Sequence, residues 1–251
     1  MRKFLTTVSA ALFALSISFP AFADSFSDAQ KGNIETIVRQ YLLANPEILQ
    51  EMANKLDEKS KLAEATQRES ALKAKSAEIF HNPADAVVGN IKGDVTVVEF
   101  FDYNCGWCKK SVSEMQALIG KDKNVRVVMK EFPIFGPGSE YAAKAALASV
   151  RQNKYWAFHQ ALFASESKVT PEVVDQIAGE QGLDVPKLKI DMNDAAILAN
   201  VRKNQELAQA LAITGTPGFV IDDQLVPGYT PLENLESMIA KVRSGGGCKV
   251  C

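Results

Sequence analysis

The chain has 251 residues, of which 28 are basic and 30 are acidic, so its net charge at pH 7 is −2. This slight acidity excludes a protein that binds nucleic acid through a large basic patch. Four cysteines are too few for a disulfide-stapled scaffold, and the length suits one catalytic domain with an accessory segment.

Residues 1–23 have the pattern of a cleaved secretory signal peptide. Arg2 and Lys3 precede an apolar run over residues 4–19 that is too short for a membrane span, and an A-x-A cleavage sequence ends at Ala23. An uncleaved anchor is the alternative. No later run is apolar enough to cross a bilayer. We therefore expect an exported protein in the periplasm of a Gram-negative cell, a compartment that permits disulfides.

Residues 24–87 are predicted to form an N-terminal helical arm. No glycine lies between Asn33 and Val88, and the pattern beyond Asp57 is charged and rich in alanine. A narrow apolar stripe on such an arm is typically buried against copies of itself, although it could also pack on its own catalytic domain. We therefore expect a homo-oligomer, either a trimer or a dimer. The stripe consists of nine side chains: Ile34, Ile37, Val38, Tyr41, Leu42, Ile48, Leu49, Met52 and Leu56.

The chemistry is predicted at the start of the next domain, which we expect to span residues 88–244. A β-branched and aromatic run over residues 94–101 predicts a buried strand, and a helix is predicted to follow Cys105-Gly106-Trp107-Cys108. The first sulfur would lie at the helix N-terminus, where unpaired N–H groups stabilise a thiolate and lower its pKa. Cys105 is therefore the expected nucleophile, and Cys108 the expected resolving thiol.

A single Cys-x-x-Cys pair is also compatible with half of a zinc site or with a structural disulfide. Zinc would need two more ligands, and the other candidates are Cys248 and Cys251 at the chain end and the two histidines, His81 and His159. The strand context, the compartment and a second motif downstream favour redox chemistry. We expect neither a metal nor an organic cofactor.

Residues 97–108 resemble the active-site strand and turn of the DsbA-like branch of the thioredoxin superfamily. The resemblance is closest to its arm-bearing ScsC-type members, named for suppression of copper sensitivity, and extends over nearly all of the chain after the signal. It implies an α/β thioredoxin fold with a helical insertion, preceded by an oligomerising helical arm. It also matches Glu99 to the buried acid of this family, which could accept and return protons during exchange; a surface glutamate on an edge strand is the alternative.

A second motif follows a long helical pattern over residues 139–213, which resembles the helical insertion of DsbA-like proteins. Within it, His159 is expected to be a half-buried, hydrogen-bonded side chain. Thr216 and Pro217 then precede a predicted strand and resemble the cis-proline loop of the superfamily. The resemblance implies that Thr216 pairs through its backbone with an extended substrate and that Pro217 blocks metal binding at the thiols.

The last predicted segment, residues 245–251, is a flexible tail, because a glycine run precedes a second Cys-x-x-Cys pair. Cys248 and Cys251 are candidate secondary thiols. They could form an idle terminal disulfide, a swinging thiol relay or a soft Cu(I) site. The six methionines are scattered, so no methionine-rich copper motif supports the last alternative.

Taken together, these patterns predict a periplasmic protein thiol–disulfide oxidoreductase, and more narrowly a disulfide isomerase. The alternatives are a simple dithiol oxidase, a Cu(I)-binding protein of copper stress, and a structural oligomer with an inert cysteine pair. The expected partners are exported proteins with disulfides or reduced thiols, and a membrane redox protein that recycles the active site.

Overall fold

The computed structural model describes residues 26–251, so the expected signal peptide lies outside the described residues. The chain forms two compact units, which divide between Lys59 and Ser60. Within the described part, no helix combines the length and the apolar character needed to cross a membrane.

The first unit is helical. Helix α1 (Asp28–Ala44) begins at a capping box, in which the side chains of Ser27 and Gln30 each accept a hydrogen bond from the backbone N–H of the other. Helix α2 (Glu47–Ala74) follows after a two-residue break and continues into the second unit. The apolar stripe is open to solvent in the single chain, because Ile37 is 65% exposed and Met52 is 62% exposed.

The second unit is built on a five-stranded sheet with the order β1-β3-β2-β4-β5. Its strands are β1 (Ala86–Gly89), β2 (Val95–Phe101), β3 (Val125–Glu131), β4 (Gly218–Ile221) and β5 (Gln224–Pro227). Strands β2 and β3 are parallel, whereas the other neighbours are antiparallel. Every residue of β2 is buried, as expected for a central strand covered on both faces.

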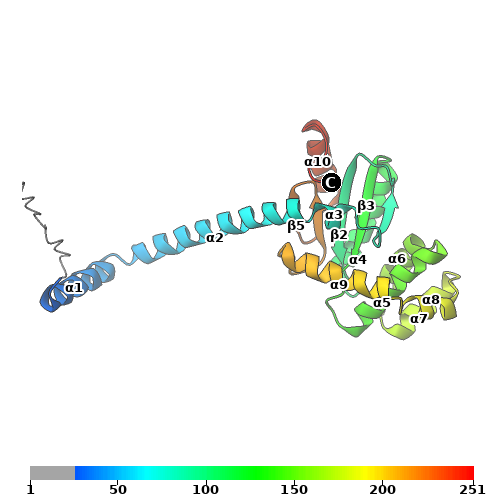
Figure 1. Cartoon of the computed structure of the whole chain (residues 1–251), viewed down its shortest axis with the longest axis horizontal. Helices are drawn as coiled ribbons and strands as arrows, with labels where there is room; N and C mark the ends of the chain where they lie inside the picture. The colour runs from blue at the N-terminus through cyan, green and yellow to red at the C-terminus, as the bar shows by residue number, and fades with distance from the viewer. Residues whose placement is uncertain (1–25) are drawn as a thin grey trace, which may run out of the picture. The chain divides into compact units, whose positions relative to one another are not determined.

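Helices cover both faces of this sheet (Figure 1). Helices α4 (Gly106–Lys121) and α10 (Leu232–Ser244) pack on one face. The expected insertion at residues 139–213 is helical, as predicted, and the end of its last helix packs on the other face. Its helices are α5 (Pro137–Ser149), α6 (Tyr155–Ala164), α7 (Pro171–Glu180), α8 (Val185–Asp191) and α9 (Ala195–Ala210), with a short 3-10 turn at Val150–Gln152.

The expected domain boundary at residue 87 does not coincide with the division of the structure. The end of α2, helix α3 (Ser76–Phe80) and strand β1 belong to the second unit, where Leu72, Ile79 and Phe80 are buried in its core. The sequence pattern did not predict this packing. The helix breaks at Lys75, so Leu72 does not lie on the same helical face as Ile79 and Phe80 in one continuous period.

Candidate active site

The Cys-x-x-Cys pair lies where strand β2 gives way to helix α4. Cys105 is the N-cap of α4, and its Sγ accepts a hydrogen bond from the backbone N–H of Cys108 at 3.4 Å. Hydrogen bonds from the Cys108 thiol and from the backbone N–H groups of Cys108 and Trp107 lower the pKa of Cys105 to about 6, although burial opposes this effect. The first cysteine is thus suited to ionise near neutral pH. The helix-terminus argument predicted this direction, but the thiol of Cys108 contributes more than the backbone N–H groups.

Cys105 is itself only 5% exposed, and Cys108, which is buried more deeply, has the opposite pKa shift. It is fully buried, and burial together with its hydrogen bond to Cys105 raises the pKa of its thiol far above the ordinary value. Both cysteines are free thiols. The pair therefore combines a sulfur that ionises readily with a protonated sulfur that can stabilise its thiolate as a hydrogen-bond donor.

Glu99 lies on β2 with its side chain toward α4, and it is only 2% exposed. Burial raises its pKa to about 8, while the neighbouring hydroxyl of Ser111 partly offsets this effect. The alternative of a surface glutamate on an edge strand is wrong, because β2 is the central strand. The charge of Glu99 also raises the pKa of Cys108, which indicates that the two groups interact. Its role as a proton acceptor stays a prediction.

The second motif lies against the first, as expected from the resemblance. The Thr216–Pro217 peptide bond is cis, and β4 begins at the next residue. Because Gly218 pairs with Phe100 near the end of β2, Thr216 is held beside the Cys-x-x-Cys turn. The thiol of Cys105 donates a hydrogen bond to the carbonyl oxygen of Thr216 at 3.2 Å.

An aromatic rim borders the two motifs, and sequence patterns did not predict it. Trp107 is 59% exposed, and its ring lies 5.8 Å from that of Tyr229. The ammonium group of Lys110 lies 4.5 Å from the centre of the Tyr229 ring, and the Tyr229 hydroxyl donates to Glu114. No sequence signal links Tyr229 to α4, because the contact depends on how the loop after β5 returns to the site.

A buried carboxylate, which sequence analysis also missed, supports the turn before Cys105. Asp102 accepts hydrogen bonds from the backbone of Asn104 at 2.7 Å and from the hydroxyl of Ser139 at 2.7 Å. It also accepts from the N–H groups of Ile134 and Phe135 in the loop after β3. An open groove of about 400 Å³ lies beside Cys105 and is lined partly by Phe135.

His159 is hydrogen-bonded, as expected, but it is fully buried rather than half-buried. Its Nδ1 lies 3.0 Å from the hydroxyl of Tyr103, and burial lowers its pKa to about 3, so the imidazole is neutral. Glu131 accepts hydrogen bonds from the hydroxyls of Tyr103 and Tyr155. This network explains the histidine as part of the core beneath the active site.

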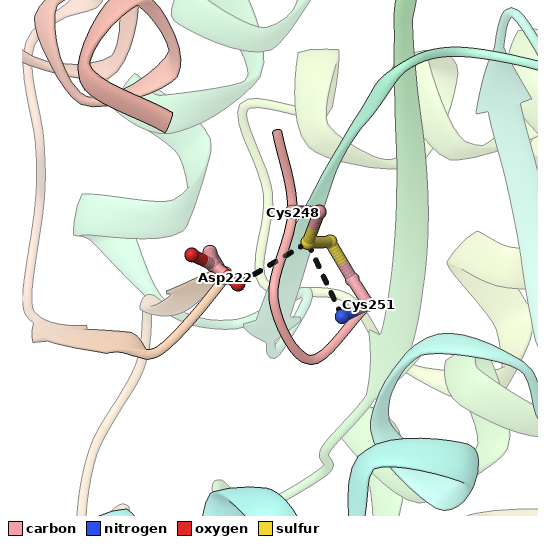
Figure 2. A group of neighbouring side chains, drawn as sticks. All are labelled: Asp222, Cys248 and Cys251. Atoms are coloured by element: carbon pink, nitrogen blue, oxygen red, sulfur yellow. Dashed lines mark hydrogen bonds between the residues drawn. A yellow bond between two sulfur atoms is a disulfide. The ribbon is translucent and has the colours of Figure 1, made fainter. Parts of the chain in front are cut away.

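The C-terminal residues are not the free tail that the glycine run predicted. Cys248 and Cys251 form a disulfide (Figure 2). Asp222 accepts hydrogen bonds from the backbone N–H groups of Lys249 and Val250 at 2.6 and 3.1 Å. The ligand atoms of Asp222, Cys248 and Cys251 all lie within 4.8 Å of one another. Because both sulfurs are used in the disulfide, they could bind a metal only after reduction.

Two protein families match parts of this chain. Residues 96–240 match the family described as DSBA-like thioredoxin domain, and residues 30–63 match the one described as copper resistance protein ScsC N-terminal domain.

Solved structures with the same fold include a thioredoxin-like oxidoreductase from Silicibacter pomeroyi. It is 45% identical, with a TM-score of 0.66, and the match covers 67% of this chain and 97% of that one. Proteus mirabilis ScsC in a transitional conformation is 26% identical, with a TM-score of 0.65, and the match covers 88% of this chain and 98% of that one.

Curated relatives include the disulfide bond formation protein D of Bacillus subtilis, 28% identical over 63% of this chain and 77% of that protein. The first relatives matched are Na(+)/H(+) antiporters NhaA, of which the chain spans only about a quarter of the length. One of these, from Salinispora tropica, is 26% identical over 65% of this chain and 26% of that protein.

Proposed function

This chain belongs to the family of DSBA-like thioredoxin domains, and from that premise we propose that it is a thiol–disulfide oxidoreductase, more narrowly a disulfide isomerase of exported proteins. Family membership confirms the resemblance and the α/β fold class predicted from the sequence. The observation that carries the proposed activity is the asymmetry of the two thiols. Cys105 has its pKa lowered to about 6, whereas burial raises the pKa of Cys108.

The proposed reaction begins with attack of the Cys105 thiolate on one sulfur of a substrate disulfide. A mixed disulfide forms, the substrate S–S bond breaks, and the second substrate sulfur leaves as a thiolate. The backbone of Thr216, beside Cys105, is suited to hold the extended substrate chain during this step. In isomerisation, another substrate thiolate then attacks the mixed disulfide and returns Cys105 to its thiolate form.

If no substrate thiol resolves the intermediate, Cys108 does so. It loses its proton, attacks the sulfur of Cys105 and releases the substrate as a dithiol, which leaves the cysteine pair oxidised. Glu99 is the proposed acceptor of that proton, because its pKa of about 8 lets it gain and lose a proton near neutral pH. A membrane redox partner is proposed to reduce the pair again.

Isomerase activity, rather than simple oxidation, is favoured by the arm. The apolar stripe of the first unit is exposed in the single chain, and residues 30–63 match the ScsC N-terminal family. Burial of this stripe between copies would make a homo-oligomer, a trimer or a dimer, with several active sites. Such an assembly can hold a misfolded protein while its disulfides are broken and remade.

The deciding experiment compares two reactions of the intact chain. Reactivation of scrambled ribonuclease measures isomerase activity, and oxidation of reduced ribonuclease measures oxidase activity. We expect the reduced protein to reactivate scrambled ribonuclease. The Cys105→Ser variant should neither reactivate scrambled ribonuclease nor oxidise reduced ribonuclease. A protein that only oxidises reduced ribonuclease would contradict the isomerase proposal and retain the oxidoreductase proposal.

A second candidate function is Cu(I) binding, which the grouping of Asp222, Cys248 and Cys251 supports. Two thiolates suit this soft ion, but the disulfide must first be reduced. A Cu(I) titration of the reduced chain, compared with Cys248→Ser/Cys251→Ser and with Cys105→Ser/Cys108→Ser, tests it. Binding that disappears only in the first variant would support the candidate, and equal binding by all three would reject it.

A further inference from the structure

A second sulfur pair is docked on the folded chain, and the proposed reaction at Cys105 does not use it. Cys248 and Cys251 are half-buried and joined by a disulfide (Figure 2). The disulfide closes a short ring that contains the backbone of Lys249 and Val250, which we call the tail ring. The backbone N–H of Cys251 donates to the sulfur of Cys248 at 3.2 Å. The ring therefore has a defined internal conformation, which presents successive N–H groups on one side.

The side chain of Asp222 accepts hydrogen bonds from these N–H groups. It lies in the turn between β4 and β5 with φ of 51°, and it is only 3% exposed. Its Oδ1 accepts from Lys249 and Val250, and it lies 3.3 Å from the sulfur of Cys248. A buried carboxylate is costly unless donors pair with it. The tail ring supplies such donors, so the burial of Asp222 depends on the ring.

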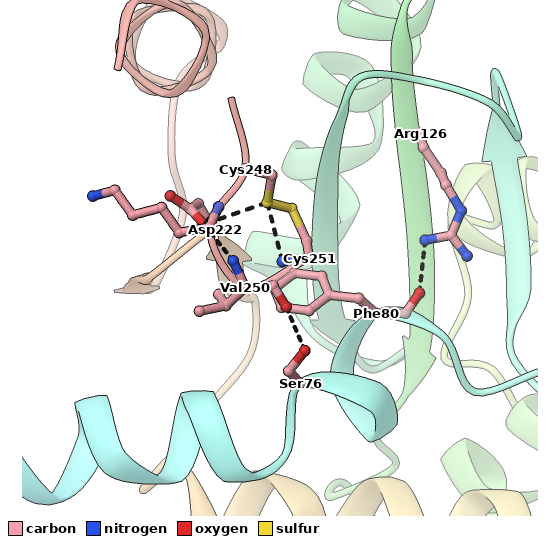
Figure 3. Close-up of a disulfide and its surroundings, with 8 residues drawn as sticks. Ser76, Phe80, Arg126, Asp222, Cys248, Val250 and Cys251 are labelled. Atoms are coloured by element: carbon pink, nitrogen blue, oxygen red, sulfur yellow. Dashed lines mark hydrogen bonds between the residues drawn. A yellow bond between two sulfur atoms is a disulfide. The ribbon is translucent and has the colours of Figure 1, made fainter. Parts of the chain in front are cut away.

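The other side of the ring is attached to the corner between α2 and α3. The hydroxyl of Ser76 donates to the carbonyl of Val250, and Val250 and Cys251 pack against the core cluster that contains Phe80 (Figure 3). A separate hydrogen bond, from Arg126 to the carbonyl of Phe80 at 2.7 Å, attaches the same corner to β3. Lys130 also donates a hydrogen bond to the carbonyl of Glu78 at 2.6 Å, so the corner has attachments that depend on the tail and others that do not.

The tail ring and Cys105 lie at opposite ends of the central strand. Strand β4 runs antiparallel to β2, with Gly218 opposite Phe100 and Ile221 opposite Val97. Asp222 follows Ile221, whereas Cys105 follows the far end of β2. With a rise of roughly 3.3 Å per residue, the separation is on the order of 15 Å or more. Direct exchange between the docked tail and Cys105 of the same chain is excluded by this distance, which removes the swinging-relay alternative for the docked state.

We propose that Cys248 and Cys251 form a second thiol–disulfide exchange site, whose substrate is a dithiol, and that its oxidised state holds the chain end across the β4–β5 turn and the α2–α3 corner. One thiolate of the dithiol attacks a tail sulfur, which breaks the tail disulfide and forms a mixed disulfide. The second thiol of the dithiol displaces the tail sulfur. The dithiol becomes a disulfide, and Cys248 and Cys251 take up its two electrons and two protons.

Reduction should release the ring for two physical reasons. Without the covalent closure, the two N–H donors are no longer held in position for Asp222. The segment before them is Gly245-Gly246-Gly247, which gains much conformational entropy on release. Ser76 would then lose its hydrogen bond to the Val250 carbonyl, and the core cluster would lose its apolar contact with the Val250 side chain. The hydrogen bond from Arg126 to Phe80 would remain.

The test uses the full chain with Cys105→Ser and Cys108→Ser, so that only the tail pair can be reduced. Hydrogen exchange of the peptides that cover residues 72–80 and 218–227 is measured with the tail oxidised and after treatment with dithiothreitol. We expect reduction to raise exchange several-fold at the corner and the turn. Adding Cys248→Ser and Cys251→Ser should reproduce the raised exchange and remove the response to the dithiol.

Lys249→Ala is the matched control, because it removes a side chain of the ring but keeps its backbone N–H and both sulfurs. It should respond to the dithiol as the parent does. Equal exchange in the oxidised and reduced states would overturn the proposal, as would a tail disulfide that excess dithiol leaves intact. If the serine variants fail to fold, mass-resolved alkylation of the intact chain follows the two cysteine pairs separately, and a tail pair that stays oxidised overturns the proposal there as well.

Discussion

The thiol of Cys105 donates a hydrogen bond to the carbonyl oxygen of Thr216, 111 positions later in the chain, at 3.2 Å. The next carbonyl, that of Pro217, accepts from the N–H of Gly228 at 2.8 Å. The loop that faces the nucleophile is therefore supported from its far side by the segment that follows β5. This placement of the Thr216 backbone beside Cys105 is the observation that supports the proposed substrate contact.

The first prediction concerns the pH dependence of Cys105. Because its pKa is lowered to about 6, the rate of alkylation should rise through pH 6 and become constant by about pH 8. An ordinary thiol, with a pKa near about 8.5, would still be mostly protonated there. Iodoacetamide kinetics between pH 4 and 9 measure this, and a midpoint above pH 8 would contradict the assigned environment.

The donor role of Cys108 can be separated from its role as resolving thiol. Cys108→Ala removes the hydrogen bond that contributes most to the lowered pKa of Cys105, so the alkylation midpoint should rise. Cys108→Ser keeps a hydroxyl donor and should shift it less. Equal midpoints in the two variants would show that the side-chain donor is not important, and that the backbone N–H groups alone stabilise the thiolate.

Replacing each thiol should stop the exchange reaction at a different stage. Cys105→Ser removes the nucleophile and should abolish reduction of a model disulfide. Cys108→Ser should accumulate mixed disulfides with protein substrates, because no thiol of the enzyme resolves them. Non-reducing electrophoresis and intact-mass measurement detect these species. Normal turnover by Cys108→Ser in an assay without other thiols would reject the assigned roles.

Glu99 is predicted to destabilise the fold as the pH rises. Burial raises its folded-state pKa to about 8, whereas an unfolded glutamate titrates near about 4.3. Between these values the folded state binds more protons, so the free energy of unfolding falls with pH across this window. Glu99→Gln stays neutral and should lose this pH dependence.

At pH 8 we therefore expect Glu99→Gln to be more stable than the parent chain by up to about 4 kcal/mol. Urea unfolding of both proteins at pH 5 and pH 8 measures the difference. If Glu99 accepts the proton of Cys108, resolution of a mixed disulfide should also slow by about 10²-fold or more. A more stable variant with unchanged resolution would leave Glu99 as a buried acid with no catalytic role.

Tyr229 is predicted to position Trp107 at the rim of the site. Tyr229→Ala removes the ring next to Trp107 and one aromatic partner of Lys110, so substrate binding should weaken several-fold, mainly through KM. Tyr229→Phe keeps the ring and removes only the hydroxyl that donates to Glu114, and it serves as the matched control. If both variants change KM equally, the hydrogen bond to Glu114 is the important contact, and the ring contact is not.

The arm prediction depends on where the chain is cut. Deleting residues 24–59 removes the first unit and should give a folded monomer with reactive Cys105 and no isomerase activity. Deleting residues 24–80 also removes the buried side chains of Leu72, Ile79 and Phe80, each worth about 2–5 kcal/mol, and should impair folding. Sedimentation and ribonuclease reactivation test both. A monomeric full-length protein would reject the oligomer proposal.

Local sequence was sufficient to predict the elements that surround the candidate active site. Strand β2, the helix start at Cys105 and the motif at Pro217 depend on hydrophobic runs and on residues with distinctive backbone preferences, which neighbours along the chain determine. The lowered pKa of Cys105 follows from the same source, because the Cys108 thiol that contributes most to it, and the N–H groups of Cys108 and Trp107, belong to the first turn of the same helix.

Only the tertiary structure decided the contacts that join distant segments. The docking of Phe80 on the sheet, the contact between the rings of Tyr229 and Trp107 and the pairing of Asp222 with the tail each join segments that are far apart in the sequence. Glycines before Cys248 predict flexibility when they are considered alone, because glycine has the largest backbone entropy. A disulfide and a buried carboxylate overcome that entropy here, and they meet because helix α10, packed against α4 and the sheet, brings the tail back to the β4–β5 turn.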